Sequence, residues 1–298
     1  MTLDHTVETE TLHTLLAEYP VTRAIHDGTA ASPLIKFDFA PIRNANKGFK
    51  PFVRETAFDA GELAIATFLQ AKDWGKPLVM LPATVAARIH HGSIAYNVER
   101  GELAPGDLDG KTVGVRAYTQ TTGMWVRGVL QNQFGVDLTS IDWLTFEDAH
   151  VAEYTNPPYV RISDGEKGLA DMLLDGELDA AILGKDMPDD PRIRRLIPDP
   201  EAAGRAWLDQ NPGAMSLNHV VVVSEDLSRR RPDVVRALFE VFRDSKEQAG
   251  LKGMDTRPFG FDAIRPSLEL AIDYCFQQGL IRRRMDVEEL FDDTTRAL

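Results

Sequence analysis

The sequence is poor in cysteine, with Cys275 alone among 298 residues. One cysteine cannot form a disulfide within the chain, and it cannot supply a cysteine-rich zinc site or hold an iron–sulfur cluster. Cys275 lies in a stretch typical of a helix, where we expect a small buried packing residue rather than a nucleophile.

Long hydrophobic runs are also absent. The first ten residues, MTLDHTVETE, lack the basic start and the apolar stretch of about 7–15 residues that mark a secretory signal. No later run approaches the roughly 18 apolar residues of a membrane span. We therefore expect a cytoplasmic protein that does not enter a membrane.

Basic residues are outnumbered: 33 Lys and Arg face 46 Asp and Glu, which gives a formal net charge of -13. This charge argues against binding to nucleic acid or to anionic membranes, because both need clustered cations. A small anionic ligand stays compatible with it, since a pocket can be locally basic. The chain also lacks a P-loop, a Gly-x-Gly-x-x-Gly fingerprint and a Gly-x-Ser-x-Gly elbow.

Short apolar runs alternate with amphipathic segments, which predicts an α/β fold. Strands are expected over 11–17, 34–39, 78–81, 112–116, 141–144, 180–183 and 219–223. Helices are expected over 60–70, 124–134, 167–175, 232–249, 267–278 and 287–298.

Two turn-rich places look like domain crossings, at 105–111 and at 211–213. They predict a discontinuous lobe formed by residues 1–108 and 219–298, with residues 109–218 inserted as a second lobe. Ligands in such two-lobed folds bind in the cleft between the lobes. The carboxyl-terminal helices fit either a cover for the core or pairing with another subunit as a homo-oligomer.

The most informative segment, 113–128, predicts a strand, a hydroxyl-rich loop and then a helix with Thr121 or Thr122 as its N-cap. Thr119, both of these threonines and Arg116 would form a cradle for a carboxylate or phosphate. Ordinary capping beside a surface arginine explains the pattern equally well. Arg127 falls about one turn into the helix, where it could face either way.

Histidines occur where a proton donor could be needed. His90 and His91 follow an expected strand, and His is the side chain that exchanges protons most readily near neutral pH. Capping or surface histidines are the commoner explanation of such a pair. His219 precedes the strand expected at the second crossing, and a structural histidine is an equally good interpretation there.

The segment 146–154 follows another expected strand and gathers acidic residues around His150, with Glu153 near its end. These residue types suit a divalent metal, but the His-Glu-x-x-His pattern is missing, so metal binding is the weaker interpretation. Asp59 and Glu62 have the spacing of a helix capping box. Arg54 has no such explanation and is a candidate carboxylate anchor.

Several sequence motifs occur together in this chain. The most specific are GVRAYTQTTGMWVRG and EDAHVAEY, and the less specific ones include FDAGELA, GELDAAILG and NHVVVV. Over residues 12–292 the chain resembles the 4,5-dihydroxyphthalate decarboxylase family, which is related to type II periplasmic binding proteins. The resemblance implies a two-lobed α/β fold of that type. It also implies decarboxylation of a hydroxylated aromatic acid, a small aromatic carboxylate, with no cofactor.

The residues can be assigned roles on this hypothesis. Carboxylates would be bound by Arg116, Thr119, Thr121 and Thr122, with Arg54 as a second anchor and Arg127 as a further contact. The proton donor would be His91 or His150, with Glu153 orienting or recharging it. His90 and His219 are alternates for the phenol contact. The rival hypotheses are a non-catalytic binding protein for a small organic anion, another enzyme on this fold, and a metal-assisted decarboxylase.

Overall fold

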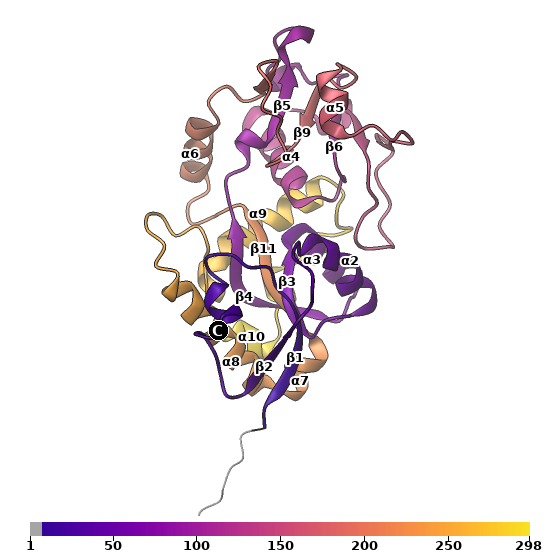
Figure 1. Ribbon diagram of the computed structural model, residues 1–298. Helices are drawn as coiled ribbons and strands as arrows, with labels where there is room; N and C mark the ends of the chain where they lie inside the picture. The colour runs from indigo at the N-terminus through magenta and orange to yellow at the C-terminus, as the bar shows by residue number, and fades with distance from the viewer. Residues whose placement is uncertain (1–7) are drawn as a thin grey trace, which may run out of the picture. The chain divides into compact units, whose positions relative to one another are not determined.

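The computed structural model describes residues 8–298, which form two compact units (Figure 1). Unit 1 comprises the residues up to 87, residues 217–265 and residues 285–298, whereas unit 2 comprises residues 88–216 and 266–284. The expected second crossing, at 218/219, is close to the observed one at 216/217. The first lies at 87/88 instead of 108/109, because residues 94–97 form a strand of the second sheet. Two further crossings follow at 265/266 and 284/285.

Unit 1 contains a five-stranded mixed sheet in the order β2-β1-β3-β11-β4. β1 pairs in parallel with β2 and β3, while β11 runs antiparallel to β3 and β4. The strands are β1 (Glu10–Leu15), β2 (Ile35–Phe39), β3 (Ala60–Ala64), β4 (Leu78–Ala87) and β11 (Leu217–Ser224).

Helices pack against this sheet, with α2 and α3 on β3 and α8 on β2 and β4. The core between α8 and the sheet is apolar: Leu81, Val221 and Leu238 are all fully buried. The helices are α1 (Arg23–His26), α2 (Asn46–Glu55), α3 (Ile65–Asp73), α7 (Glu225–Arg230), α8 (Pro232–Gln248) and α10 (Asp293–Arg296), with the 3-10 turn η5 (Val287–Leu290).

The segment expected as one helix over 60–70 is a strand followed by a helix. β3 ends at Ala64, and α3 begins at Ile65. The predicted capping box of Asp59 and Glu62 is therefore wrong, because Glu62 lies in the middle of a strand with all five residues buried. The Asp59 carboxylate instead accepts a hydrogen bond from the backbone N–H of His13 at 2.9 Å. A short apolar run such as 60–64 suits either a helix or a buried strand. Pairing with β1 and β11 makes it a strand here.

Unit 2 is built on a six-stranded sheet in the order β10-β5-β9-β6-β7-β8. β6, β7, β8 and β9 run parallel, whereas β5 is antiparallel to both β9 and β10. The strands are β5 (Ile94–Asn97), β6 (Thr112–Val115), β7 (Asp142–Thr145), β8 (Val160–Ile162), β9 (Ala180–Ile182) and β10 (Ile193–Arg195).

The helices of unit 2 are joined by aromatic packing. Trp207 donates its indole N–H to the Tyr274 hydroxyl at 3.2 Å, and both rings pack edge-on against Trp125. Gly128 is required there, because a Cβ atom at this position would lie 1.9 Å from the Tyr274 ring. The elements are α4 (Thr121–Phe134), α5 (Leu169–Leu174), α6 (Pro200–Gln210), α9 (Phe261–Gln277), η1 (His91–Ser93), η2 (Val98–Arg100), η3 (Pro105–Asp107) and η4 (Leu138–Ser140), with α9 entering unit 2 at Pro266.

One further expectation changes in detail. The helix expected over 287–298 is divided into η5 and α10, because Phe291 and Asp292 between them are extended.

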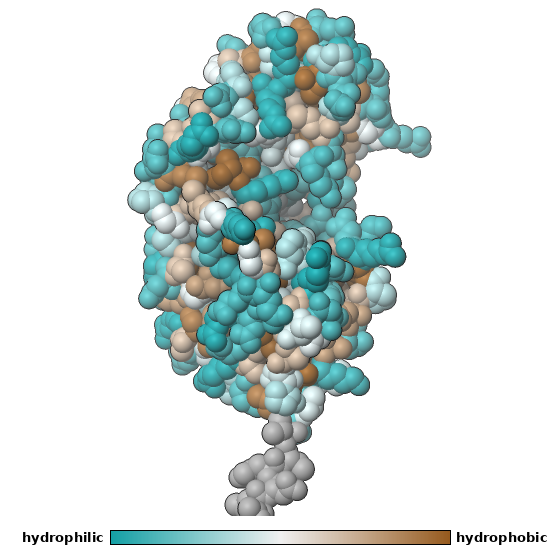
Figure 2. Space-filling view, turned by 60° about the vertical axis from the view of Figure 1, so that its left-hand side comes forward, coloured by the Kyte–Doolittle hydropathy of each residue, from teal (hydrophilic) through white to brown (hydrophobic). Residues whose placement is uncertain are grey.

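The surface drawn in Figure 2 is mainly hydrophilic with scattered hydrophobic residues, in keeping with the acidic composition. Among residues 8–298, no helix has the length and apolar character that crossing a membrane requires.

Candidate functional site

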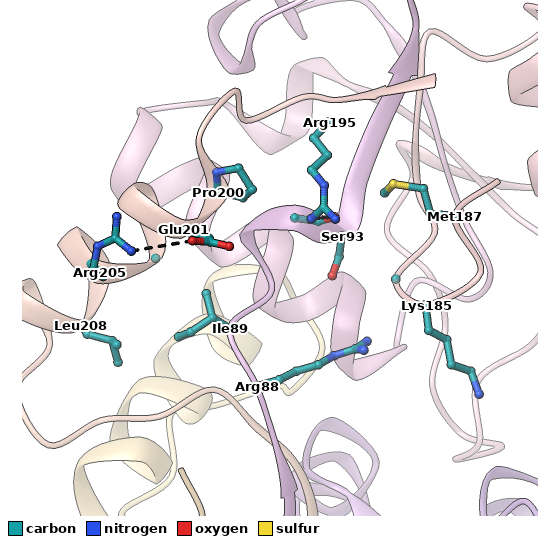
Figure 3. Close-up of a pocket in the computed structure, with 13 residues that line it drawn as sticks. Arg88, Ile89, Ser93, Lys185, Met187, Arg195, Pro200, Glu201, Arg205 and Leu208 are labelled. Carbon is teal, nitrogen blue, oxygen red and sulfur yellow. Dashed lines mark hydrogen bonds and ion pairs between the residues drawn. The ribbon is translucent and has the colours of Figure 1, made fainter. Parts of the chain in front are cut away.

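Unit 2 contains a cavity of about 630 Å³ that is rich in basic side chains (Figure 3). We call it the basic cavity; its lining consists of Arg88, Ile89, Gly92, Ser93, Gly184, Lys185, Met187, Arg195, Pro200, Glu201, Gly204, Arg205 and Leu208. Four cationic side chains thus face a single carboxylate, in a chain whose net charge is -13. Ile89, Met187 and Leu208 give it an apolar part as well. A cavity of this size and mixture suits a small organic anion.

The cations of the basic cavity differ in how far they are already neutralised. Arg205 lies 4.0 Å from the Glu201 carboxylate, and Arg195 donates to the backbone carbonyl of Gly92 at 3.2 Å. The side chains of Arg88 and Lys185 make no hydrogen bond or ion pair with residues 8–298. These two cations are therefore available to an anion that enters the cavity.

Arg88 is the central cation of this group. Figure 3 shows its side chain extending toward the Ser93 hydroxyl. The residue is exposed, but protein atoms surround its guanidinium closely enough that desolvation lowers its pKa, against the charge of Asp186, which raises it. A cation that has lost part of its water is stabilised by an incoming carboxylate more than a fully hydrated one is.

Two glycines allow the cavity wall to approach these arginines. A Cβ atom at Gly92 would lie 1.9 Å from a terminal nitrogen of Arg195. At Gly184, which has a φ of +63°, it would lie 3.3 Å from an Arg88 nitrogen and 3.6 Å from the Thr122 methyl group. Gly184 therefore lies between Arg88 and the start of α4, so the basic cavity borders the predicted threonine segment.

The histidine pair does not line this cavity, although it lies in the same segment as Arg88 and Ser93. His90 and His91 are each 1% exposed. Nε2 of His91 lies 2.8 Å from the Gln133 side-chain oxygen, and the ring packs edge-on against Trp207. Burial lowers the pKa of His91, while the bond to Gln133 opposes this effect. Burial favours a neutral structural histidine, and the predicted role of His91 as proton donor stays a prediction.

The threonine segment begins α4 differently from the expectation. Gln120 is the N-cap residue and makes no side-chain capping bond, so Thr121 and Thr122 are the first two helical residues. Both threonines and Thr119 are buried. The first N–H groups of a helix have no partner within the helix, which is what makes such a start suitable for an anion.

Arg127 lies beneath this segment and not on its surface. It is completely buried, donates to the Tyr118 carbonyl at 2.5 Å and to the Gln278 side-chain oxygen at 2.8 Å, and stacks 3.9 Å from the Tyr118 ring centre. No carboxylate of residues 8–298 pairs with it, and burial lowers its pKa. We therefore assign Arg127 to holding the threonine segment in place of the predicted ligand contact.

Arg116 and the acidic segment meet at the carboxyl ends of β6 and β7. The backbone N–H groups of Phe146 and Glu147 donate to the Arg116 carbonyl, each at 2.9 Å. The Glu147 carboxylate lies 3.7 Å from Nε of Arg116, so it already neutralises part of that charge. His150 and Glu153 lie in the following loop, half-buried and exposed respectively. Their predicted catalytic roles stay predictions.

Metal binding is not supported by any cluster in the described part of the chain. No group of three or more His, Cys, Asp or Glu side chains within residues 8–298 is arranged to hold a metal ion.

Unit 1 contains a second group of polar residues, centred on Glu62. Its carboxylate is fully buried and accepts hydrogen bonds from the Ala17 N–H at 2.6 Å and from the Tyr19 hydroxyl at 2.9 Å. Nδ1 of His219 lies 2.5 Å from the same carboxylate and 3.3 Å from the Tyr19 oxygen. Burial, together with the neighbouring charge of Glu62, raises the pKa of Tyr19, which keeps that hydroxyl protonated.

Strand pairing explains why Glu62 and His219 meet. Glu62 on β3 lies opposite Val221 on β11, so His219 is its diagonal neighbour on the same face of the sheet. The sequence indicated His219 but not Glu62 or Tyr19. The available signal for Glu62 was a single carboxylate inside an apolar run, but the predicted capping box gave that carboxylate another role.

Arg54 lies exposed in the last turn of α2, and its predicted anchoring role is untested.

The chain resembles two curated proteins that are both named 4,5-dihydroxyphthalate decarboxylase. The protein from Comamonas testosteroni is 27% identical over 241 residues, which cover 74% of this chain and 72% of that protein. The one from Pseudomonas putida is 27% identical over 172 residues, covering 53% of this chain and 66% of that protein. No family model matches the sequence.

Solved structures identify the fold. The periplasmic aliphatic sulphonate binding protein SsuA from Escherichia coli superposes with a TM-score of 0.60 at 12% identity, over 95% of this chain and 98% of SsuA. At that identity the likeness concerns the fold alone.

Proposed function

We propose that this chain is a carboxy-lyase for a small hydroxylated aromatic acid and needs no organic cofactor. The premise is that it has the two-unit α/β fold of type II periplasmic binding proteins and resembles decarboxylases in sequence. The observation that carries the proposal is the basic cavity, in which the side chains of Arg88 and Lys185 make no hydrogen bond or ion pair with residues 8–298. Such cations recognise carboxylates, and the apolar side chains beside them suit an aromatic ring.

Decarboxylation of such an acid requires a proton donor and a binding site for the carboxylate. Direct loss of CO2 from a benzoate would leave an unstable aryl anion. Protonation of the ring carbon that bears the carboxylate avoids this, because a hydroxyl ortho or para to it supplies electrons and the ring becomes dienone-like. The bond to the carboxylate then breaks, its electrons restore the aromatic ring, and CO2 leaves. One proton is consumed, and it replaces the carboxylate on the ring.

The proposal assigns binding roles to groups on unit 2. Arg88 and Lys185 in the basic cavity would hold a carboxylate, with the buried threonines at the start of α4 beside them. We expect Arg116 to contribute less than these groups, because the Glu147 carboxylate lies 3.7 Å from its Nε atom. The substrate is thus a small aromatic carboxylate.

The test is CO2 release from purified, chelator-treated protein with a panel of hydroxylated benzoates and phthalates, headed by 4,5-dihydroxyphthalate. We expect turnover without added metal. Tight binding of a panel member with no CO2 release, before and after divalent metal is restored, would contradict the proposal and favour a binding protein for organic anions. Turnover only after metal is restored would replace it with a metal-assisted decarboxylase.

A further inference from the structure

Ser93 differs from the other polar residues that line the basic cavity, because it is buried and they are exposed. The residue is 6% exposed, and its hydroxyl makes no hydrogen bond with residues 8–298. Figure 3 shows this hydroxyl pointing into the cavity, on the side where the Arg88 guanidinium lies. A buried hydroxyl is unfavourable without a hydrogen-bond partner, so its partner must come from outside these residues.

The backbone at Ser93 is held by hydrogen bonds on both sides of the residue. Its N–H donates to the His90 carbonyl at 2.9 Å, and its own carbonyl accepts from the N–H groups of Leu183 and Gly184 at 2.9 and 3.1 Å. Gly184 is also the residue at which an added Cβ atom would lie 3.3 Å from an Arg88 nitrogen. Ser93 and Arg88 are therefore held at the same part of the cavity wall.

The neighbouring side chains limit what the Ser93 hydroxyl can bind. Guanidinium and ammonium groups only donate hydrogen bonds, so neither Arg88 nor Lys185 can accept the serine proton. The one carboxylate of the lining belongs to Glu201, which Figure 3 shows beside Arg205 on α6. A ligand group that only accepts hydrogen bonds satisfies both Ser93 and Arg88. An ionised carboxylate is such a group, whereas a carboxamide brings two N–H donors of its own.

We propose that Ser93 is a specificity-determining residue of the basic cavity, whose hydroxyl donates a hydrogen bond to the substrate carboxylate that Arg88 pairs with. The inference rests on the proposed function and names the group that the cavity recognises. Donors converge on this group from a charged and a neutral side chain, so the cavity selects aromatic acids with an ionised carboxylate. Carboxamides with the same ring are discriminated against, because their N–H groups meet donors.

The first experiment measures dissociation constants by titration calorimetry for 2-, 3- and 4-hydroxybenzoate and for the three matching hydroxybenzamides. We expect the wild type to bind at least one of the acids and to bind its amide more weakly. In Ser93→Ala the dissociation constant of that acid should rise about 10- to 100-fold, the equivalent of one hydrogen bond to a charged group. The dissociation constant of the amide should stay near its wild-type value.

Ser245→Ala is the matched control. Ser245 is also a buried serine whose hydroxyl makes no hydrogen bond with residues 8–298, but it lies on α8 in unit 1 and does not line the basic cavity. This variant should keep both dissociation constants. Circular dichroism and thermal melting establish that each variant is folded. A folded Ser93→Ala with the wild-type affinity for the acid would overturn the inference, and so would an equal loss of affinity for acid and amide.

The second experiment tests whether Ser93 and Arg88 bind the same carboxylate. Ser93→Ala, Arg88→Gln and the double variant are titrated with the acid that the wild type binds. Two residues that bind one group are coupled, so the double variant should lose at least about 2-fold less affinity than the product of the two single losses. A purely structural role of Ser93 predicts losses that multiply, and that result would contradict the inference.

Binding and CO2 release distinguish the two proposals. A wild type that binds a hydroxybenzoate but releases no CO2 from any panel member overturns the proposed function, while the affinities of Ser93→Ala still decide whether Ser93 binds the carboxylate. A wild type that releases CO2 and whose Ser93→Ala variant keeps the affinity for the acid overturns the inference alone. A wild type that binds none of the acids and releases no CO2 overturns both.

Discussion

Glu62 of unit 1 is buried and held by hydrogen bonds, whereas the cations of the basic cavity of unit 2 are exposed, and Arg88 and Lys185 make no hydrogen bond or ion pair with residues 8–298. Glu62 is fully buried and its partners fix its geometry, while Arg88 and Lys185 await a partner. A buried carboxylate with its donors in place contributes to stability, because loss of a donor leaves a buried oxygen without a partner. Accessible cations suit reversible capture of an anion. The difference teaches that changes around Glu62 should affect stability, and changes in the basic cavity should affect KM.

Arg88→Gln gives the largest effect expected for unit 2. Loss of a charge-assisted hydrogen bond corresponds to about 1.5–3 kcal/mol, so KM should rise about 10- to 100-fold while kcat changes little. Arg194→Gln is the matched control, because Arg194 is a neighbour of the cavity residue Arg195 but pairs with Glu102 instead. Steady-state kinetics measure both constants. A fall in kcat with unchanged KM would break the comparison between the units.

Arg127→Met sharpens the comparison because it removes a cation of unit 2 that is completely buried, unlike the exposed cations of the basic cavity. The substitution leaves the Tyr118 carbonyl and the Gln278 side-chain oxygen without their donor, which costs about 1–3 kcal/mol of unfolding free energy. Urea denaturation measures this loss. Unchanged stability would mean that relief of the desolvation of Arg127 offsets the lost bonds, and the residue would not hold the threonine segment.

Gly184→Ala should cost about 1 kcal/mol of stability, because alanine is strained at a φ of +63°. The new methyl group would also crowd Arg88, so KM should increase. Gly75→Ala is the matched control: its φ is +68°, but no atom lies within 4 Å of the added carbon. Both variants should lose similar stability in thermal melting, and only Gly184→Ala should change KM. Equal KM values in the two variants would contradict the placement of Arg88.

His91→Gln should have the smallest effect, confined to the pH dependence of stability. Burial depresses the pKa of His91 in the folded state below its ordinary 6.5. The unfolded chain therefore takes up a proton first as pH falls through 6.5, and the wild type loses stability there. The variant cannot titrate at this position, so its unfolding free energy should decrease less between pH 7 and pH 5. Identical decreases in urea denaturation would show that His91 is not a desolvated neutral histidine.

Much of the fold could be predicted because periodic or uniformly apolar segments leave few alternatives. α8 spans Pro232–Gln248 against an expected 232–249, and β11 contains the whole of the expected 219–223. The prediction of one helix over 60–70 was wrong because its first residues suit either a helix or a buried strand. Only pairing with β1 and β11 decides between the two. Tertiary contacts of this kind leave no local trace in the sequence.

The candidate site was harder to predict, for two physical reasons. In the segment 88–93 the sequence indicated the two histidines, whereas Arg88 and Ser93 line the basic cavity and the histidines are buried between them. The direction of neighbouring side chains in irregular backbone does not follow a fixed period. Lys185, Arg195 and Arg205 come from three other segments, and nothing in the local sequence distinguishes them from surface cations.

The most direct test of the proposed function is a kinetic comparison of the wild type, Arg88→Gln and Arg194→Gln with one substrate identified from the panel. We expect the wild type and Arg194→Gln to release CO2 with similar kcat and KM, and Arg88→Gln to show a KM raised about 10- to 100-fold at a similar kcat. An unchanged KM in Arg88→Gln, or no CO2 release by the wild type, would contradict this account.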